Sequence, residues 1–155
     1  MPRAFLSLGS NIGDRRGHLA AGVEIVAANE PFRLSSVYET EPVGGVEQDL
    51  YWNVVLELRT DASARDLLNR ARRAEEARGR VREIRWGPRT LDVDVLLVGE
   101  ERSDDPEIEV PHPRMYERSF VLVPLHELAP ELVSDAQLAA GVGALTRLGT
   151  LDSLH

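Results

Sequence analysis

No cysteine occurs among the 155 residues of this chain. Disulfide bridges, thiol nucleophiles and thiolate metal sites are therefore excluded, and any metal ion would be bound by oxygen or imidazole ligands. Lysine is absent as well, because all 18 basic residues are arginine, so the lysine-containing phosphate-binding loop of many nucleotide-binding proteins is missing. A nucleotide, if one binds, must be held by other groups.

Long apolar runs are also missing. No stretch approaches the ~18 consecutive apolar residues of a membrane-spanning helix, and the N-terminus has no apolar segment of signal-peptide length. We therefore expect a cytoplasmic protein without a membrane partner. Its 155 residues, 43% of them hydrophobic and 28% charged, are typical of one globular domain. We expect a single domain over residues 1–155 that acts as a monomer.

The charge is unevenly distributed along the chain. The net charge of -8 argues against a nucleic-acid partner, because the surface as a whole would repel a polyanion. Residues 59–89 nevertheless contain ten arginines and only five acidic residues. This local excess of positive charge indicates a small anionic ligand.

Hydrophobic periodicity predicts six elements in the order strand, helix, strand, strand, helix, strand. They are the strand 4–8, the helix after Asp14, the strands 32–40 and 50–60, the helix between Ser63 and Gly79, and the strand 91–98. This order predicts an α+β fold of the ferredoxin-like β-α-β-β-α-β type, an antiparallel sheet with both helices on one face and the other face open. We expect additional C-terminal helices near residues 120–128 and 137–148.

The second helix has clear local signals. Ser63 and Asp66 have the spacing of a capping box, and Gly79 stands where a helix ends in a left-handed residue. An apolar stripe lies between these ends. Its members are Ala64, Leu67, Leu68, Ala71 and Ala74.

Alternation along two strands separates core residues from site candidates, since successive side chains point to opposite faces. The predicted core-facing residues are Trp52, Val54, Leu56 and Leu58 on one strand, and Leu91, Val93, Val95 and Leu97 on the other. Tyr51, Asn53 and Glu57 then face away from the core. Asp92 and Asp94 share that opposite face, ~6.5–7 Å apart along the strand.

Asp92 and Asp94 are candidate metal ligands. Two carboxylates at this spacing repel each other unless a cation lies between them, and a hard divalent ion completed by water and phosphate oxygens would relieve the repulsion. An Asp-x-Asp pattern is also typical of the solvated side of an amphipathic strand. The pattern alone leaves both interpretations open.

An arginine-rich segment, residues 79–89, immediately precedes this strand. Its guanidinium groups suit phosphate oxygens, and its glycines and proline would allow it to close over a ligand. Metal-binding acids next to such arginines favour phosphoryl transfer. A solvated charge run is the alternative interpretation of the arginines.

Aromatic and histidine candidates lie on either side of this segment. Tyr51 and Phe120 would usually be core aromatics, but as a pair flanking Asn53 they could enclose a flat heterocycle whose edge the amide binds. His112 stands between Pro111 and Pro113, which restrict the backbone around it.

Several motifs together resemble one family. They are Gly9-Ser10-Asn11, residues 38–44, Tyr51-Trp52-Asn53, and residues 79–82, 85–94 and 111–120. In this order they resemble the 6-hydroxymethyl-7,8-dihydropterin pyrophosphokinases of folate biosynthesis, and the block 85–94 is the most specific. The resemblance implies transfer of a diphosphate group from ATP to the 6-hydroxymethyl oxygen of the pterin, with release of AMP.

The resemblance also implies roles for individual residues. Asp92 and Asp94 would hold two Mg²⁺ ions, and with Arg80 and Arg89 they would form the catalytic group. The implied pterin-binding residues are Thr40, Pro42, Val43, Tyr51, Asn53 and Phe120. The implied nucleotide-binding residues are Glu75, Arg80, Arg82, Trp86, Arg89, His112 and Arg118.

Two other function classes can be weighed against this one. A non-catalytic ferredoxin-like module that binds a small anionic metabolite would use the arginines, but it would not need Asp92 and Asp94 on one face. A nucleic-acid binder is disfavoured by the net charge and by the lack of exposed aromatic residues at stacking spacing on adjacent strands. The paired aspartates therefore discriminate between these classes.

Overall fold

The computed structural model describes residues 2–40, 50–79, 90–141 and 143–154. Its strands are β1 (Arg3–Ser10), β2 (Phe32–Leu34), β3 (Val37–Thr40), β4 (Tyr51–Arg59), β5 (Asp92–Val98), β6 (Ser103–Asp105), β7 (Ile108–Val110) and β8 (Leu145–Gly149). The main sheet has the order β5-β1-β4-β3-β8, with β2 also paired to β4, and all its pairs are antiparallel. A separate hairpin joins β6 to β7.

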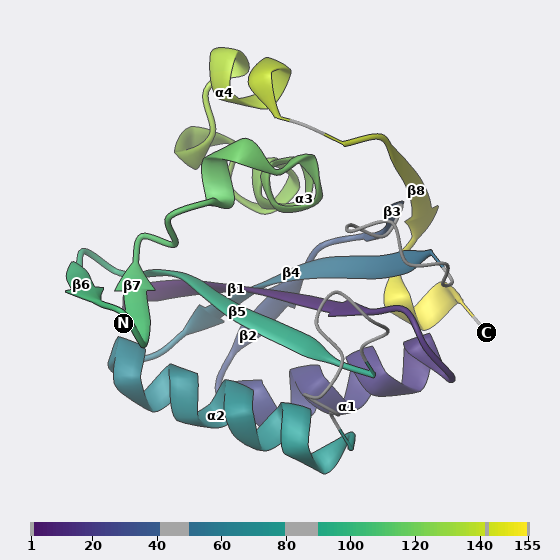
Figure 1. Ribbon diagram of the computed structural model, residues 1–155, viewed down its shortest axis with the longest axis horizontal. Coiled ribbons are helices and arrows are strands. Elements are labelled where there is room, and N and C mark those ends of the chain that lie inside the picture. The colour runs from purple at the N-terminus through teal and green to yellow at the C-terminus, as the bar shows by residue number, and fades with distance from the viewer. Residues whose placement is uncertain (1, 41–49, 80–89, 142, 155) are drawn as a thin grey trace.

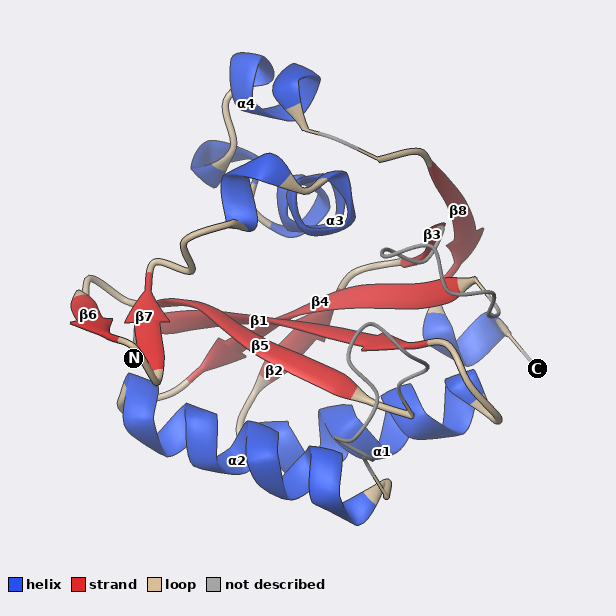
Figure 2. Ribbon diagram, viewed as in Figure 1, coloured by secondary structure: helices blue, strands red, loops and turns tan. Residues whose placement is uncertain are grey.

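Helices lie on both sides of the main sheet (Figures 1 and 2). They are α1 (Arg15–Ala27), α2 (Ala64–Ala77), α3 (Ser119–Leu128) and α4 (Asp135–Ala140), with short 3-10 turns at Met115–Glu117, Pro130–Leu132 and Leu151–Ser153. The helices α1 and α2 cover one face, and α3 and α4 lie beyond the other. The predicted β-α-β-β-α-β order and antiparallel sheet are confirmed. None of the described helices is long and apolar enough to span a lipid bilayer.

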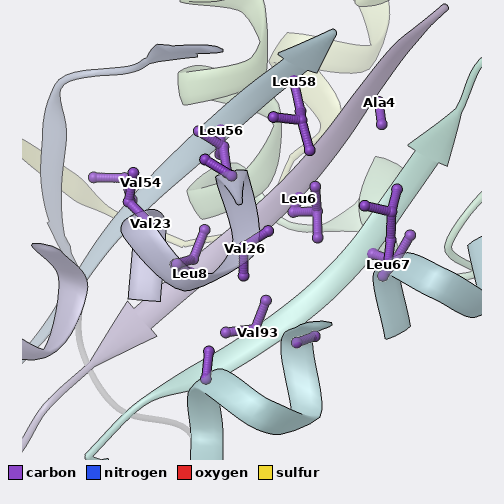
Figure 3. Packing of buried hydrophobic residues seen from close by; sticks show 14 of the residues in the cluster. Ala4, Leu6, Leu8, Val23, Val26, Val54, Leu56, Leu58, Leu67 and Val93 are labelled. Atoms are coloured by element: carbon purple, nitrogen blue, oxygen red, sulfur yellow. The ribbon is translucent and has the colours of Figure 1, made fainter. Parts of the chain in front are cut away.

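The larger core lies between the sheet and the helices α1 and α2. Leu6 and Leu8 of β1 pack there with Leu56 of β4, and Val26 and Leu67 contribute from the two helices (Figure 3). The alternation predicted for β4 holds, since Val54, Leu56 and Leu58 belong to this core and Trp52 packs against it. The alternation therefore leaves Asn53 on the opposite face.

Local capping signals explain where the first two helices begin. The side chain of Asp14 accepts a hydrogen bond from the Gly17 backbone at 3.0 Å, which caps α1. Ser63 and Asp66 form the predicted capping box at the start of α2. Gly79, with φ of 70°, follows α2 in the left-handed conformation that was expected of it.

The opposite face of the sheet is only partly open, because the C-terminal helix predicted near residues 120–128 forms as α3 and covers part of it. A second apolar cluster lies there, between the sheet and α3. Its buried members are Phe5, Val55, Leu96, Met115, Val121, Leu122, Leu125, Ala129 and Val133. The helix α3 therefore covers the half of this face that carries Phe5 and Val55, and Asn53, Asp92 and Asp94 lie in the other half.

The strand expected over residues 32–40 is interrupted. Leu34 pairs with Leu56 and Tyr38 pairs with Asn53, so four steps along β2 and β3 match three steps along β4. One residue is extra, as in a β-bulge. The Ser35 backbone N–H donates to the Val55 carbonyl, and the Ser35 hydroxyl accepts from the Val55 backbone N–H. Both backbone groups of Val55 are therefore hydrogen-bonded where the strand is interrupted.

A second bulge makes the predicted orientation of Leu97 wrong. Phe5 pairs with Leu97 and Leu6 with Val95, so Leu96 has no partner of its own on β1. The extra residue reverses the alternation, and both Leu96 and Leu97 pack on the α3 side. Asp92 and Asp94 precede the bulge and keep the predicted orientation.

The helix expected over residues 137–148 is shorter than predicted. The helix α4 ends at Ala140, and Leu145–Gly149 forms the strand β8 along the edge of β3. Gly143 has a φ of 117°, and this backbone conformation is incompatible with an α-helix through that residue. Pairing with β8 also covers an edge that β3 would otherwise expose.

Candidate active site

Three residues form one row across the centre of the sheet. Gly9 of β1 pairs with Asn53 of β4 on one side and with Asp92 of β5 on the other. Directly opposite residues in antiparallel strands point to the same face, so the amide and the carboxylate flank a position that has no side chain. Asn53 and Asp92 are thus two strand spacings apart, roughly 9–10 Å between their backbones.

Asp92 and Asp94 both lie on this face, and both are half-buried. Asp94 is opposite Ser7 in the next row of the sheet. Carboxylate oxygens two residues apart on a strand are hard ligands, which suit Mg²⁺ when water and phosphate oxygens complete its coordination. Among the described residues, no group of three or more histidine or acidic side chains is placed to hold a metal ion. The two carboxylates could supply part of the coordination of a Mg²⁺ ion, with water and phosphate oxygens as the other ligands.

Glu75 supports the strand that carries these aspartates. The Glu75 side chain is buried, and its carboxylate accepts a hydrogen bond from the Val93 backbone N–H at 2.9 Å. β5 is at the edge of the sheet, so this amide, between the two aspartates, is bonded by a side chain of α2. Glu75 thereby fixes the backbone from which both carboxylates project.

Asn53 is held by a buried hydrogen bond. Its Nδ2 atom donates to Thr40 Oγ1 at 2.8 Å, and both side chains are buried. Tyr51, two residues earlier on β4, is half-buried and pairs with Thr40. Three of the residues that the resemblance assigned to the pterin are therefore brought together at the joined ends of β3 and β4.

His112 lies beside β5. Its backbone N–H donates to the Leu96 carbonyl at 2.9 Å, and its Nδ1 atom accepts from the Arg114 backbone at 3.2 Å. Burial lowers the pKa of His112 below its ordinary value, and the charges of Arg118 and Arg114 lower it further. At neutral pH the ring is therefore uncharged, and its proton is on Nε2, where it can be donated to an anion.

Arg118 and Phe120 are placed as a pair at the start of α3. The Arg118 guanidinium carbon lies 5.4 Å from the centre of the Phe120 ring, within the range of a cation–π contact. Phe120 is half-buried and packs against the apolar cluster under α3. The contact couples the orientation of a cationic side chain to that of an aromatic ring.

A partly buried polar network, which was not predicted from the sequence, anchors α3. The Glu127 carboxylate accepts from the Ser36 backbone and hydroxyl and, at 2.7 Å, from the Tyr38 hydroxyl. Burial, with the hydrogen bond and charge of Glu127, raises the pKa of Tyr38 to about 12. No local pattern predicts this network, because Glu127 lies 89 residues beyond Tyr38.

Six of the expected site residues lie outside the described residues. They are Pro42, Val43, Arg80, Arg82, Trp86 and Arg89. Of the others, Thr40, Tyr51 and Asn53 are grouped at one end of β4, Asp92 and Asp94 lie across Gly9 from them, and Glu75 lies beneath β5.

This fold and site define a class of protein. It is a small α+β enzyme whose paired carboxylates suit a divalent cation and phosphate chemistry. Residues 5–130 match the 7,8-dihydro-6-hydroxymethylpterin-pyrophosphokinase family, and the chain belongs to that family.

Several relatives carry the same name, 2-amino-4-hydroxy-6-hydroxymethyldihydropteridine pyrophosphokinase. The Bacillus subtilis protein is 43% identical over 88% of this chain and 83% of its own length. The Methylorubrum extorquens protein is 45% identical over 86% of both chains. The Pseudomonas aeruginosa protein is 41% identical over 84% of this chain and 82% of its own.

Proposed function

We propose that this protein transfers the β,γ-diphosphate of ATP to the 6-hydroxymethyl oxygen of 6-hydroxymethyl-7,8-dihydropterin, in folate biosynthesis. Membership of the pyrophosphokinase family supports this reaction. The observation that carries the proposal for the site is the row Asn53–Gly9–Asp92, which puts a polar side chain for the substrate ring and a metal-binding carboxylate on one face.

Asp92 and Asp94 would hold two Mg²⁺ ions together with the phosphate oxygens of ATP. Bound there, Mg²⁺ would neutralise charge that develops on the transferred group and on the leaving AMP. The pterin hydroxyl oxygen would attack the β-phosphorus and lose its proton to water, while the bond from the β-phosphorus to the α–β bridging oxygen breaks and AMP leaves. Glu75 keeps the two carboxylates in place by its bond to the Val93 backbone.

The pterin would lie beside Asn53 and Thr40. An amide offers both a donor and an acceptor, which matches the adjacent donors and acceptors on the edge of a pterin ring. Tyr51 and Phe120 would stack on the two faces of the ring, and the backbone near Pro42 and Val43 would complete its recognition. With the ring at Asn53, the hydroxymethyl group would extend over Gly9 towards Asp92.

The ATP phosphates would be contacted by arginines and by His112. Arg80, Arg82 and Arg89, with Trp86, would close over the nucleotide, and Arg80 and Arg89 would stabilise the transferred group. Arg118 would approach the phosphates from the start of α3, and the Nε2 proton of His112 would approach them from beside β5. Glu75 stands near the nucleotide in this assignment, as a support for β5.

The pKa of His112 should lie below its ordinary value in the free protein and rise when ATP binds. Phosphate oxygens near the ring favour the imidazolium, so they oppose the effects of burial and of the neighbouring arginines. Protonation and ATP binding then favour each other, and ATP affinity should increase as the pH falls through this pKa. An NMR titration of the imidazole protons measures the shift.

Adenosine is the matched comparison, because it lacks the phosphates and should leave the pKa of His112 unchanged. A pKa that is equally unchanged with ATP bound would remove His112 from the phosphate contacts.

The reaction itself is tested by incubating the protein with ATP, Mg²⁺ and 6-hydroxymethyl-7,8-dihydropterin and separating the nucleotide products. We expect AMP in a one-to-one ratio with the diphosphorylated pterin. Release of ADP would indicate a simple kinase instead. Binding of the pterin without any product would favour the non-catalytic module that binds a small anionic metabolite.

We further propose that the enzyme works as a cytoplasmic monomer, with residues 1–155 as one domain. It would need only ATP, the pterin and Mg²⁺, with no nucleic-acid or membrane partner.

A further inference from the structure

We infer that Gly9 is a positioning residue that sets the specificity of this site for its ring substrate, an inference that rests on the proposed function. Gly9 lies in β1, an inner strand of the sheet, between Asn53 of β4 and Asp92 of β5. Its role follows from what a side chain would displace at this position.

A Cβ atom at Gly9 would lie 2.7 Å from Asn53 Oδ1 and 3.6 Å from Tyr51 Cδ1. The first distance is far below van der Waals contact, so the Asn53 amide and any side chain at position 9 exclude each other. The contact involves one end of the amide, and the other end donates to Thr40 Oγ1. The missing side chain therefore allows Asn53 to lie against β1 and to reach Thr40 at the same time.

The backbone does not explain the glycine. The left-handed glycines of the described residues are Gly13, Gly79, Gly99, Gly143 and Gly149, and Gly9 is not among them. It has the extended conformation of a paired strand residue, which alanine adopts without strain. The requirement for glycine is therefore a requirement for space beside Asn53.

Loss of this space would change recognition before it changed the fold. The atom that a new methyl group meets is at the end of a short side chain, and the Asn53 amide can rotate away. Rotation breaks the bond to Thr40 and turns the amide away from the position in which it would bind the ring edge. The methyl group would make only an ordinary van der Waals contact with the Tyr51 ring, the proposed stacking surface, so the conflict is with Asn53.

The ligand class follows from the same geometry. A flat heterocycle with adjacent hydrogen-bond donors and acceptors at one end fits the fixed amide. Because Gly9 has no side chain, a slim substituent at the other end of the ring could pass over it towards Asp92, and a side chain at position 9 would occupy that path. Gly9 thus selects both the orientation of the ring and the size of its reacting substituent.

The test is a double-mutant cycle of Gly9→Ala and Asn53→Ala, with steady-state kinetics for both substrates. Gly9→Ala should raise KM for the pterin about tenfold or more, the scale of a lost well-placed hydrogen bond, and should leave KM for ATP within about twofold. In the Asn53→Ala background, Gly9→Ala should have little further effect, because the shortened side chain leaves room for the methyl group.

Gly22→Ala is the matched control. Its added Cβ would meet Leu91 and Leu8 side chains at 2.9 and 3.0 Å in the core on the far side of the sheet. It should change the thermal unfolding midpoint and leave KM for the pterin unchanged. An equal rise in KM for Gly9→Ala and Gly22→Ala would show a general effect on the fold and overturn the inference.

The remaining outcomes are also decisive. An unchanged KM for Gly9→Ala, or an equal effect of Gly9→Ala with and without Asn53, would overturn the inference while AMP formation by the unaltered protein upholds the proposed function. If Gly9→Ala fails to fold, the double variant tests the inference instead. A folded double variant with the kinetics of Asn53→Ala supports the steric coupling between the two residues. An unfolded double variant refutes it. No AMP from the unaltered protein would overturn both.

Discussion

Asp94→Asn should lower kcat by about a hundredfold to a thousandfold at saturating Mg²⁺, the scale on which charge-stabilising groups act in enzymes. The amide keeps the size of the side chain and one oxygen ligand, but it loses the negative charge that holds a divalent cation next to Asp92. Binding of the pterin should be affected little, because Asn53 and Thr40 lie on the other side of β1 from Asp94. Chromatography of AMP over a series of Mg²⁺ concentrations measures the loss.

Asp104→Asn provides the control for this substitution. Asp104 is an exposed residue of the separate hairpin β6–β7, so its replacement makes the same chemical change away from the site. Titration calorimetry with the pterin alone separates the possible causes of a loss at Asp94. If Asp94→Asn lost pterin binding and turnover equally, misfolding would explain the result better than the loss of a metal ligand.

Glu75→Ala should raise the Mg²⁺ concentration for half-maximal activity by about tenfold to a hundredfold, the usual effect of removing a group that orients metal ligands. The substitution leaves the Val93 N–H without its acceptor in a buried place, which should also lower the free energy of unfolding by about 1–3 kcal/mol. The backbone between Asp92 and Asp94 is then less well fixed. Activity across a Mg²⁺ series and thermal unfolding measure the two effects.

Glu75→Gln distinguishes the hydrogen bond from the charge. Its amide oxygen can still accept from Val93, so it should restore most of the stability and of the Mg²⁺ dependence. Glu76→Ala, an exposed neighbour on α2, should behave like the unaltered protein. A rise in KM for ATP at every Mg²⁺ concentration would instead make Glu75 a direct nucleotide contact.

Features that depend on neighbouring residues were predictable from the sequence. The capping box of Ser63 and Asp66 and the left-handed Gly79 are set by interactions within a few residues, and both occur as expected. Asp92 and Asp94 could be placed on one face because Leu91, Val93 and Val95 alternate with them.

Features that depend on distant partners were not predictable in the same way. The run from Val93 to Val98 is almost entirely apolar, so nothing in it marks Leu96 as the extra residue of a bulge; only the register against β1 does. The strand β8 forms because β3 offers an edge. The contact between Gly9 and Asn53 likewise depends on the pairing of β1 with β4, so it could not be predicted from the glycine motif alone.

The position of β1 between β4 and β5 has a consequence for how the protein folds. β1 pairs with β4 on one side and with β5 on the other, and both partners are distant in sequence: Gly9 pairs with Asn53, 44 residues later, and with Asp92, 83 residues later. Closing such long loops is entropically costly, and sheets built from distant segments fold slowly. The row Asn53–Gly9–Asp92 can form only in the step that joins all three strands, so recovery of ligand binding during refolding should report the cooperative formation of the whole sheet.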